Sequence, residues 1–408
     1  MAAATKTYAY SARDTAGKVV KGRVDATTEA AVVSKLRSMG VTPINVSEAG
    51  TGMNRDISFG SFGKKVGQKD LAVMARQMAT MVGAGLSLIR TLTILADQTE
   101  NKELARVLAL IRTDVESGSA LSESMLKHPT VFPPLMIHLV RSGETGGFLD
   151  TSLGGAADNL EADVKLRDTI KSAMTYPVIV LIIAGVSVVG MLLFIVPIFQ
   201  KMFDDLGGQL PLPTQILVVL SQAMPWIAII LIPSIIIFNV WWRANKHTDR
   251  VRSVIDPIKL KLPVFGILFK KVAVARFARN FSTMMGAGVP ILQSLSIVGE
   301  TSGSYVVEQS LKKVQESVRQ GKSVSGPLAQ EPVFPSMVVQ MIAVGEDSGA
   351  MEIMLDKIAE FYESEVEQTT NALTSLIEPL MIAFIGVVIG GMIVALYLPV
   401  FSIFNEIK

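Results

Sequence analysis

Three long apolar runs without a charged residue dominate the hydrophobic pattern of this 408-residue chain, at positions 178–199, 216–242 and 380–404. A helix needs about 20 apolar residues to cross the roughly 30 Å hydrocarbon core of a bilayer, so each run is long enough to span it. Buried helices of a soluble domain fit less well, because their apolar stretches usually end after about 10–14 residues. The pattern predicts transmembrane helices over residues 173–200, 214–242 and 376–404.

Between the apolar runs, hydrophobic residues recur at the spacing of amphipathic helices. One such face carries Leu71, Met74 and Met78, and another carries Leu153, Ala157 and Leu160. We expect about six short helices, without strand-like alternation, in each of the segments 67–172 and 270–374. Apolar stripes of this kind are typical of helices that pack on one another, so each segment is predicted to be a helical bundle.

The two bundle segments are copies of one unit. ARQMATMVGAG at 75–85 recurs as ARNFSTMMGAG at 278–288, with seven of eleven residues identical at an offset of 203. Further matches have an offset of 202: Phe132-Pro133 with Phe334-Pro335, Gly143-Glu144 with Gly345-Glu346, and Pro177 with Pro379. The difference of one residue predicts a single small insertion in a loop. Two units of the same orientation need one extra crossing, and the middle apolar run supplies it.

A small module precedes the first bundle. Short strands are predicted at Tyr8–Tyr10, Val19–Val24 and Val41–Val46, with a helix at Ala26–Met39 that stops at Gly40. Residues 1–48 are therefore predicted to form an α/β module, and the Gly- and Ser-rich segment 49–66 to be a flexible linker. The fold class expected is an all-α membrane protein with two homologous cytosolic six-helix bundles, three transmembrane helices and this small module.

Basic residues set the predicted orientation in the membrane. The loop after the first span, Lys201–Pro213, has one basic residue, whereas the connector at 243–269 after the second span has six. Cytoplasmic loops carry an excess of Lys and Arg. We therefore expect the N-terminus and both bundles in the cytosol, and the C-terminus outside.

Composition narrows the function. The net charge of +2 gives no general case for nucleic-acid binding, and the absence of cysteine excludes disulfides and thiolate metal sites. Gly321-Lys322-Ser323 resembles the end of a phosphate-binding loop, but Glu316 stands where that loop needs a glycine. The three histidines lack the spacing of metal ligands. We expect no catalytic, cofactor or metal site.

Two glutamates, Glu144 and Glu346, each follow a glycine at the end of an apolar helix. The structural interpretation is that each carboxylate accepts hydrogen bonds from free N–H groups at the start of the next helix. The functional interpretation is a contact to a partner or a ligand to an oxygen-seeking cation. One or two carboxylates do not make a cation cage, so no metal is assigned.

Residues around the repeats and the membrane edge complete the candidates. Glu378 lies at the cytosolic edge of the third span, where a charge is solvated at headgroup level, or faces another helix if it lies deeper. The candidate partner or interface residues are Arg76, Gly83, Gly85, Gly143, Glu144, Arg279, Gly286, Gly288, Gly345, Glu346 and Glu378. The candidate transmembrane packing residues are Pro177, Pro379, Gly386 and Gly390, and the last two form a pair that permits close helix approach and self-association.

These motifs together resemble the F-domain family of type II secretion, the inner-membrane platform proteins of type II secretion and type IV pilus machines. The resemblance covers nearly the whole chain and includes the opening Tyr8-x-Tyr10-x-Ala12-x-Asp14. The first repeat departs from the pattern with Leu86-Ser87 where the second has Val289-Pro290, and with Tyr176 in place of Glu378.

The resemblance implies a non-enzymatic platform in the bacterial inner membrane that forms a dimer or a higher homo-oligomer. Its partners would be a hexameric cytosolic assembly ATPase, with or without a retraction ATPase, pilin or pseudopilin subunits, and inner-membrane alignment proteins. A pilus platform is favoured over a secretion platform, which stays the alternative. A small-molecule transporter with parallel repeats is a distant alternative, because it needs polar groups at mid-membrane and the first span offers only Ser187 there.

Overall fold

The computed structural model describes residues 6–13, 19–38, 40–48, 65–205, 210–246 and 248–406. Most of the predicted linker, the tip of the loop after the first span, His247 and the last two residues lie outside this described part. The chain divides into two compact units, Met1–Gly63 and Lys64–Lys408.

The N-terminal unit is a three-stranded antiparallel sheet with one helix. Its elements are β1 (Lys6–Arg13), β2 (Val19–Ala26), α1 (Glu29–Ser38) and β3 (Thr42–Glu48), and the strand order is β2-β1-β3. Val32 and Leu36 of α1 pack on Tyr8 of β1 to form its core. The helix begins later than predicted, because residues up to Ala26 pair with β1 and the Thr28 hydroxyl then accepts the N–H of Ala31.

The first bundle contains six helices, the number predicted. They are α2 (Gln68–Gly83), α3 (Leu88–Gln98), α4 (Lys102–Glu116), α5 (Leu121–Leu126), α6 (Pro134–Gly146) and the first part of α7 (Leu149–Gly190). The predicted apolar stripe is buried, with Met74 and Met78 almost wholly inaccessible. Gly85 has φ +84°, so the Gly-Ala-Gly triplet ends α2 through a left-handed glycine. Ser87 stands at the N-cap of α3, although its side chain makes no capping hydrogen bond.

The second bundle repeats this order. Its helices are α11 (Phe265–Gly286), α12 (Ile291–Thr301), α13 (Tyr305–Arg319), α14 (Ser325–Leu328), α15 (Ser336–Ser348) and the first part of α16 (Met351–Glu406). Matching positions keep the offset of 203 through α5 and α14, and have the offset of 202 from α6 and α15 onward. The predicted one-residue insertion therefore lies in the loop between α5 and α6.

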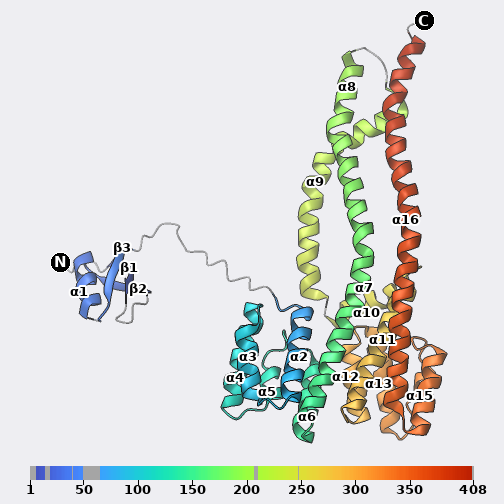
Figure 1. Ribbon diagram of the computed structural model, residues 1–408. Coiled ribbons are helices and arrows are strands. Elements are labelled where there is room, and N and C mark those ends of the chain that lie inside the picture. Colours follow the sequence, from blue (N-terminus) through green and yellow to red (C-terminus); the bar gives the residue numbers. More distant parts are fainter. Residues whose placement is uncertain are drawn as a thin grey trace. The chain divides into compact units, whose positions relative to one another are not determined.

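Within the described part of the chain, three helices are long and apolar enough to cross a membrane, and each contains one predicted span. The first is α7, which continues through a short π-helix (Met191–Ile195) into α8 (Val196–Asp205); the second is α9 (Leu212–Asn245); the third is α16. In both repeats the last helix of the bundle runs into the membrane span without a break. Both bundles lie at the same end of the three long helices (Figure 1).

The middle span packs on the other two where prolines interrupt their hydrogen-bond ladders. Pro399 has no N–H for the carbonyl of Ala395, and the Thr214 hydroxyl donates to that carbonyl at 2.5 Å. The π-helix shifts the ladder so that the Leu192 carbonyl faces position 197, another proline, and the Ser221 hydroxyl donates to it at 2.5 Å. Both hydroxyls are buried. The middle span therefore satisfies one proline-freed carbonyl in each repeat, as an apolar environment requires.

The segment between the second span and the second bundle forms a helix of its own, α10 (Asp249–Lys261), followed by a turn at Val264. Val264 has φ +72°, which a β-branched residue rarely adopts. The predicted basic connector is therefore an ordered helix within the described part of the chain, and α10 packs on α11 and α13.

A glycine lets the last two helices of each bundle approach closely. A Cβ on Gly143 would lie 2.6 Å from the Ser152 hydroxyl and 2.9 Å from the Leu149 Cα. A Cβ on Gly345 would lie 3.0 Å from the Met351 Cα. Only glycine fits at either position without a shift of the neighbouring helix, so the repeated Gly-Glu pairs have a packing role in both bundles.

The close approach gives a test. Substitution of Gly143→Ala should destabilise the first bundle by about 1–3 kcal/mol, because the new methyl group overlaps the α7 backbone. Gly154→Ala is the matched control: Gly154 lies in α7 with no atom within 4 Å of a built Cβ. It should be neutral or stabilise by up to about 1 kcal/mol. Thermal unfolding of the detergent-solubilised protein measures both, and equal melting temperatures for the two variants would contradict the packing role.

Candidate functional site: contacts that join each bundle to its membrane helix

The first repeat has an arginine clamp between its first helix and its membrane helix. Arg76 of α2 donates through Nε and Nη2 to both carboxylate oxygens of Glu161 on α7, each at 2.7 Å. The same guanidinium also pairs with Asp158, one turn earlier on α7. Bidentate pairing of this kind fixes both the distance and the angle between the two helices.

The second repeat has the same clamp. Arg279 of α11 donates to Glu363 of α16 at 2.8 Å and 3.1 Å and also pairs with Asp356. Arg279 and Glu363 occupy the positions of Arg76 and Glu161 in the repeat, whereas the second carboxylate comes from a different turn of the long helix. We call these two sets the arginine clamps: Arg76 with Asp158 and Glu161, and Arg279 with Asp356 and Glu363.

The clamps differ in exposure. The Arg76 side chain is 40% exposed and the Arg279 side chain 20%. Burial alone would lower the pKa of Arg279, but hydrogen bonding and charge from Glu363 and Asp356 raise it. The hydrogen bonds that Arg76 donates to Glu161 and Asp158 raise its pKa as well. Because solvent screens the first clamp more, the second should hold its helices more strongly.

Glu144 and Glu346 each hold the start of a short helix. Glu144 of α6 accepts the N–H groups of Leu121 and Ser122 at 2.5 Å and 3.1 Å, at the start of α5. Glu346 of α15 accepts those of Val324 and Ser325 at 2.8 Å and 3.2 Å, at the start of α14. A carboxylate at a helix N-terminus satisfies orphan donors and favours the helix dipole. The predicted acceptor role is correct, but the helix is the preceding one rather than the next.

The remaining glycine candidates lie at the ends of the first helices. Gly83 and Gly286 are the last residues of α2 and α11, and Gly288 has φ +64° like its mate Gly85. A Cβ on Gly286 would come within 2.7 Å of the Glu352 carboxylate, whereas Gly83 has open space around it. These glycines shape the turns, and a contact to a partner stays a prediction for them.

At the membrane edge the two repeats differ. Pro177 is buried within α7, whereas Glu378 and Pro379 are exposed on α16. Gly386 and Gly390 have no atom within 4 Å of a built Cβ, so neither packs on another helix of this chain. That face of α16 is open, and its predicted role in self-association stays a prediction.

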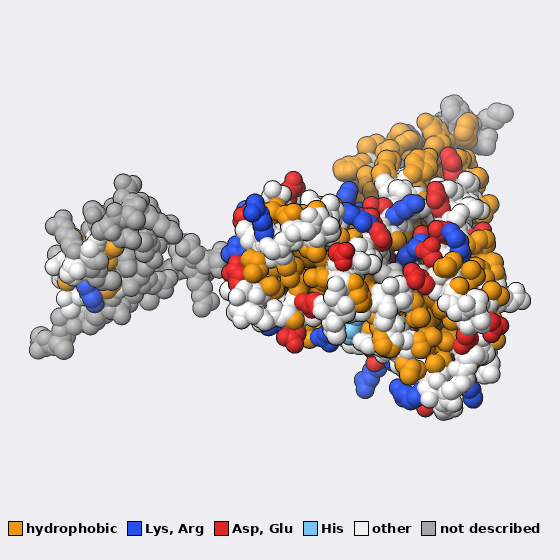
Figure 2. Space-filling model, turned by 60° about the horizontal axis from the view of Figure 1, so that its bottom comes forward, with side chains coloured by type: hydrophobic (Ala, Val, Ile, Leu, Met, Phe, Trp, Pro, Cys, Tyr) orange, Lys and Arg blue, Asp and Glu red, His pale blue; other side chains and the backbone are white. Residues whose placement is uncertain are grey.

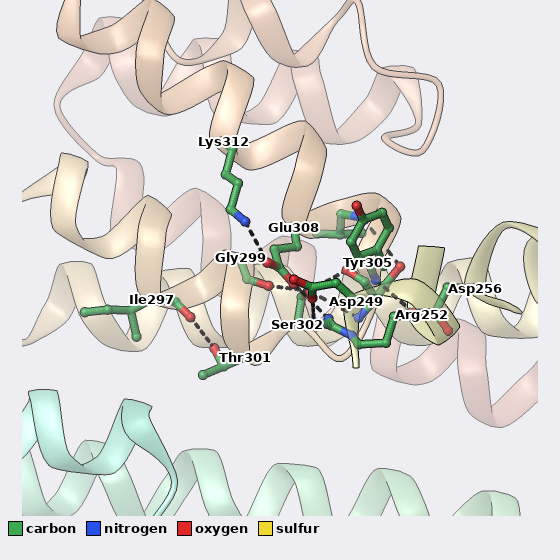
Figure 3. Close-up of polar contacts among 12 residues, drawn as sticks. Asp249, Arg252, Asp256, Ile297, Gly299, Thr301, Ser302, Tyr305, Glu308 and Lys312 are labelled. Carbon is green, nitrogen blue, oxygen red and sulfur yellow. Dashed lines mark hydrogen bonds and ion pairs between the residues drawn. The ribbon is translucent and has the colours of Figure 1, made fainter. Parts of the chain in front are cut away.

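A polar cluster joins α10 to the second bundle (Figure 3). Arg252 of α10 pairs with Glu308 of α13 at 2.8 Å, and Lys312 approaches the same carboxylate at 2.8 Å. Asp256 of α10 accepts the N–H of Tyr305 at 3.0 Å, at the start of α13. The Arg252 guanidinium lies 5.7 Å from the centre of the Tyr305 ring. These contacts tie the C-terminal end of the second span to the second bundle.

Charge and burial compete at Glu308. Burial would raise the pKa of this carboxyl, but hydrogen bonds from Lys312 and Arg252 outweigh it and lower the pKa. The group is therefore ionised at neutral pH, and its ion pairs are in force there. Among the described residues no group of three or more His, Asp or Glu side chains is arranged to hold a metal ion.

Several of these partners could not be named from the sequence. Glu161 and Glu363 stand at the repeat offset of 202, so the internal repeat itself was a usable signal for the clamps. Asp158 and Asp356 break that register and give no such signal. The partners of Arg252 and Asp256 lie about 50 residues away on another helix, and no local pattern indicates them.

Two family models match the chain. The model described as type II secretion system protein F matches residues 74–197 and 277–399, one stretch in each repeat, and the model of that protein's N-terminal domain matches residues 1–47. The matches cover more than half of the chain. It therefore belongs to the type II secretion system protein F family, and the resemblance noted in the sequence is confirmed.

Relatives along the full length carry two kinds of name. A type IV pilus assembly protein PilC of Myxococcus xanthus is 42% identical over 406 residues, 99% of this chain and 97% of the relative. A PilC of Thermus thermophilus is 41% identical over 404 residues, 98% of this chain and 99% of the relative. A type II secretion system protein F of Xanthomonas campestris is 30% identical over 404 residues, with 98% and 99% covered.

The clamps predict unequal effects on stability. Arg279→Gln should destabilise the protein by about 1–3 kcal/mol, because it leaves two carboxylates without their hydrogen-bond donor. Arg76→Gln should cost less, since its clamp is more exposed. Arg106→Gln, which removes a surface pair with Glu103 whose arginine is 58% exposed, is the control and should have the smallest effect on stability of the three. Thermal unfolding followed by circular dichroism ranks the three variants. Equal losses of thermal stability in the Arg279→Gln and Arg106→Gln variants would contradict a stabilising role for the second clamp.

Proposed function

We propose that this chain is the inner-membrane platform of a type IV pilus assembly machine. The observation that carries the proposal is its full-length similarity to proteins named for pilus assembly, at 41–42% identity, against 30% for the secretion protein of Xanthomonas campestris. The platform would couple a cytosolic assembly ATPase to the insertion of pilin subunits into the fibre. The ATP chemistry belongs to that partner and the lifting of the pilin to the platform.

The architecture supports a mechanical role. In each repeat an arginine clamp joins the first bundle helix to the helix that enters the membrane. The glycine contact at Gly143 or Gly345 holds the preceding helix on that same rod. A force on the bundle surface would therefore reach the bilayer through one continuous helix. Packed elements of this kind transmit displacement because their interiors are close-packed and resist compression.

The middle span extends the connection. Its cytoplasmic end leads into α10, which is tied to α13 by the Arg252–Glu308 pair. Within the membrane its hydroxyls bond to the first and third spans. Movement of the second bundle would thus displace all three spans together.

We propose that the bundles and the N-terminus face the cytosol and the C-terminus faces outward, in the inner membrane of a bacterium. The basic residues of α10 and the position of both bundles at one end of the spans support this orientation. Figure 2 shows hydrophobic side chains over the membrane helices and interspersed charges on the bundles. Large polar surfaces of this kind suit docking of an ATPase from the cytosol and of alignment proteins at the bilayer.

The secretion platform is the second candidate. The same family model and the 30% identical relatives support it, because protein F of type II secretion shares the two repeats and the N-terminal domain. In that role the lifted subunits would be pseudopilins. The clamps and caps would act in the same way.

Gene deletion in the native host separates the two. We expect the deletion to abolish surface pili while secretion of folded enzymes continues, and a plasmid copy of the full chain to restore the pili. Electron microscopy counts the fibres and culture-supernatant assays measure secretion. Loss of secretion with normal pili would reverse the assignment.

A matched pair of variants then tests the coupling. The Arg279→Gln chain should restore at most about a tenth of the pili at an equal amount in the membrane, whereas the Arg106→Gln chain should restore them fully. Full restoration by both would mean that the second clamp has no part in transmission.

A further inference from the structure

The two bundles contact each other head to tail. The Asn159 side chain of α7 donates to the Asn280 side chain of α11 at 2.8 Å, and both residues are buried. The Ser142 hydroxyl of α6 donates to the Ala287 carbonyl at 2.9 Å. Asp163 of α7 pairs with Arg276 of α11 at 2.7 Å. The last two helices of the first bundle thus meet the first helix of the second.

Comparison of the two repeats shows that the contact between the bundles lacks two-fold symmetry. Position 159 of the first bundle corresponds to Phe361 in the second, and position 280 of the second corresponds to Gln77 in the first. A two-fold contact would also bring Gln77 and Phe361 together, yet both are exposed. α7 and α16 also pack on each other, with Leu166 and Val366 in one apolar cluster. The polar part of the interface is nevertheless heterologous: it uses two different surfaces and leaves the other copy of each one uncovered.

The uncovered copy on the second bundle is apolar at two of the three contact positions; at the third, Glu365 stands in place of Asp163 and pairs with Lys271 of its own bundle at 2.7 Å. The equivalents of Ser142 and Asn159 are Val344 and Phe361, which are 57% and 46% exposed. Ile353, two turns before Phe361 on the same face of α16, is 58% exposed. We call Val344, Ile353 and Phe361 the free α16 face. Polar contacts of the first bundle have thus been replaced by hydrophobic side chains, and burial of such side chains favours association.

The uncovered copy on the first bundle lies along α2. The equivalents of Arg276, Asn280 and Ala287 are Val73, Gln77 and Ala84, all exposed and spaced to share one side of the helix. We call these three residues the free α2 face. Val73, 50% exposed, replaces the charged Arg276 with a hydrophobic side chain.

We infer that the free α16 face of one chain binds the free α2 face of a second copy of this chain, in the geometry of the bundle contact within the chain. The internal repeat identifies the partner surface. Inside the chain, Asn159 is covered by the surface of α11, and the equivalent of that surface in the other repeat is the free α2 face. Phe361 then lies against Gln77, and Val344 against Ala84. This inference stands apart from the proposed function, since it holds for a pilus or a secretion platform alike.

The membrane restricts what such contacts build. A heterologous contact gives a closed ring or an open filament. All bundles enter the same bilayer through their own helices, so they stay at one level and the contact closes into a ring. A ring that lacks two-fold pairing needs at least three bundles, and each chain contributes two. The smallest ring therefore contains four bundles from two chains.

The chain has no cysteine, so introduced cysteines report single contacts. One tagged copy with Gln77→Cys and a differently tagged copy with Phe361→Cys are produced together and cross-linked in native membranes with a short bis-maleimide. We expect a mixed dimer at least ten-fold above the dimers of either variant alone. An Asn159→Cys, Asn280→Cys double variant is the positive control and should link within one chain without a dimer band.

A second exposed position supplies the negative control. Leu110 of α4 belongs to neither free face and is 43% exposed. Leu110→Cys paired with Phe361→Cys should give a yield near background. Equal yields from the Leu110 and Gln77 pairs, or self-dimers as abundant as mixed ones, would overturn the inference.

Charge substitution gives an independent readout. Phe361→Asp should shift the detergent-solubilised full chain from the oligomer towards the monomer and raise the dissociation constant of the oligomer at least ten-fold. Leu110→Asp should leave the oligomer unchanged. Light scattering after size-exclusion chromatography measures the mass. An unaltered mass for Phe361→Asp, at an unchanged melting temperature, would also overturn the inference.

Discussion

One constraint organises this molecule: the last helix of each bundle does not end at the membrane surface. α7 begins at Leu149 in the first bundle and continues through the short π-helix and α8 to Asp205, and α16 extends from Met351 to Glu406. The arginine clamps and the glycine contacts all act on the bundle part of these two rods. Because bundle and anchor are one helix, neither can change its tilt without the other. Both bundles lie at the same end of the three long helices, and the middle one provides the return crossing between them.

The same logic explains why the middle span differs from the repeated ones. It has no bundle of its own, and its buried hydroxyls instead bond to carbonyls that prolines free in the neighbouring spans. Apolar surroundings make such unpaired carbonyls costly, so the helices are held in register by polar contacts within an otherwise hydrophobic interface. At its C-terminal end, α10 and the pair of Arg252 with Glu308 connect the middle span to the second bundle. The spans and the second bundle therefore form one connected structure.

Sequence reasoning reached the parts of this architecture that depend on local pattern. Hydropathy located the spans, and the 202–203 offset revealed the two bundles. It could not find the helix that Glu144 caps, because the donors lie 22 and 23 residues earlier and are brought close only by packing. The continuity of α7 through Pro177 was hidden as well, since the pattern changes there from an amphipathic stripe to an apolar run. Contacts such as Thr214 to Ala395 depend on tertiary structure alone.

The central claim is that both bundles lie on the same side of the membrane. Labelling of single cysteines introduced into the cysteine-free chain tests it most directly. Glu100→Cys and Lys322→Cys place an exposed thiol on each bundle, and Asp205→Cys places one at the end of the first membrane rod. A membrane-impermeant maleimide added to intact spheroplasts should label position 205 alone, and should label positions 100 and 322 only after lysis. Labelling of position 100 or 322, but not both, before lysis would put the bundles on opposite sides and contradict the account.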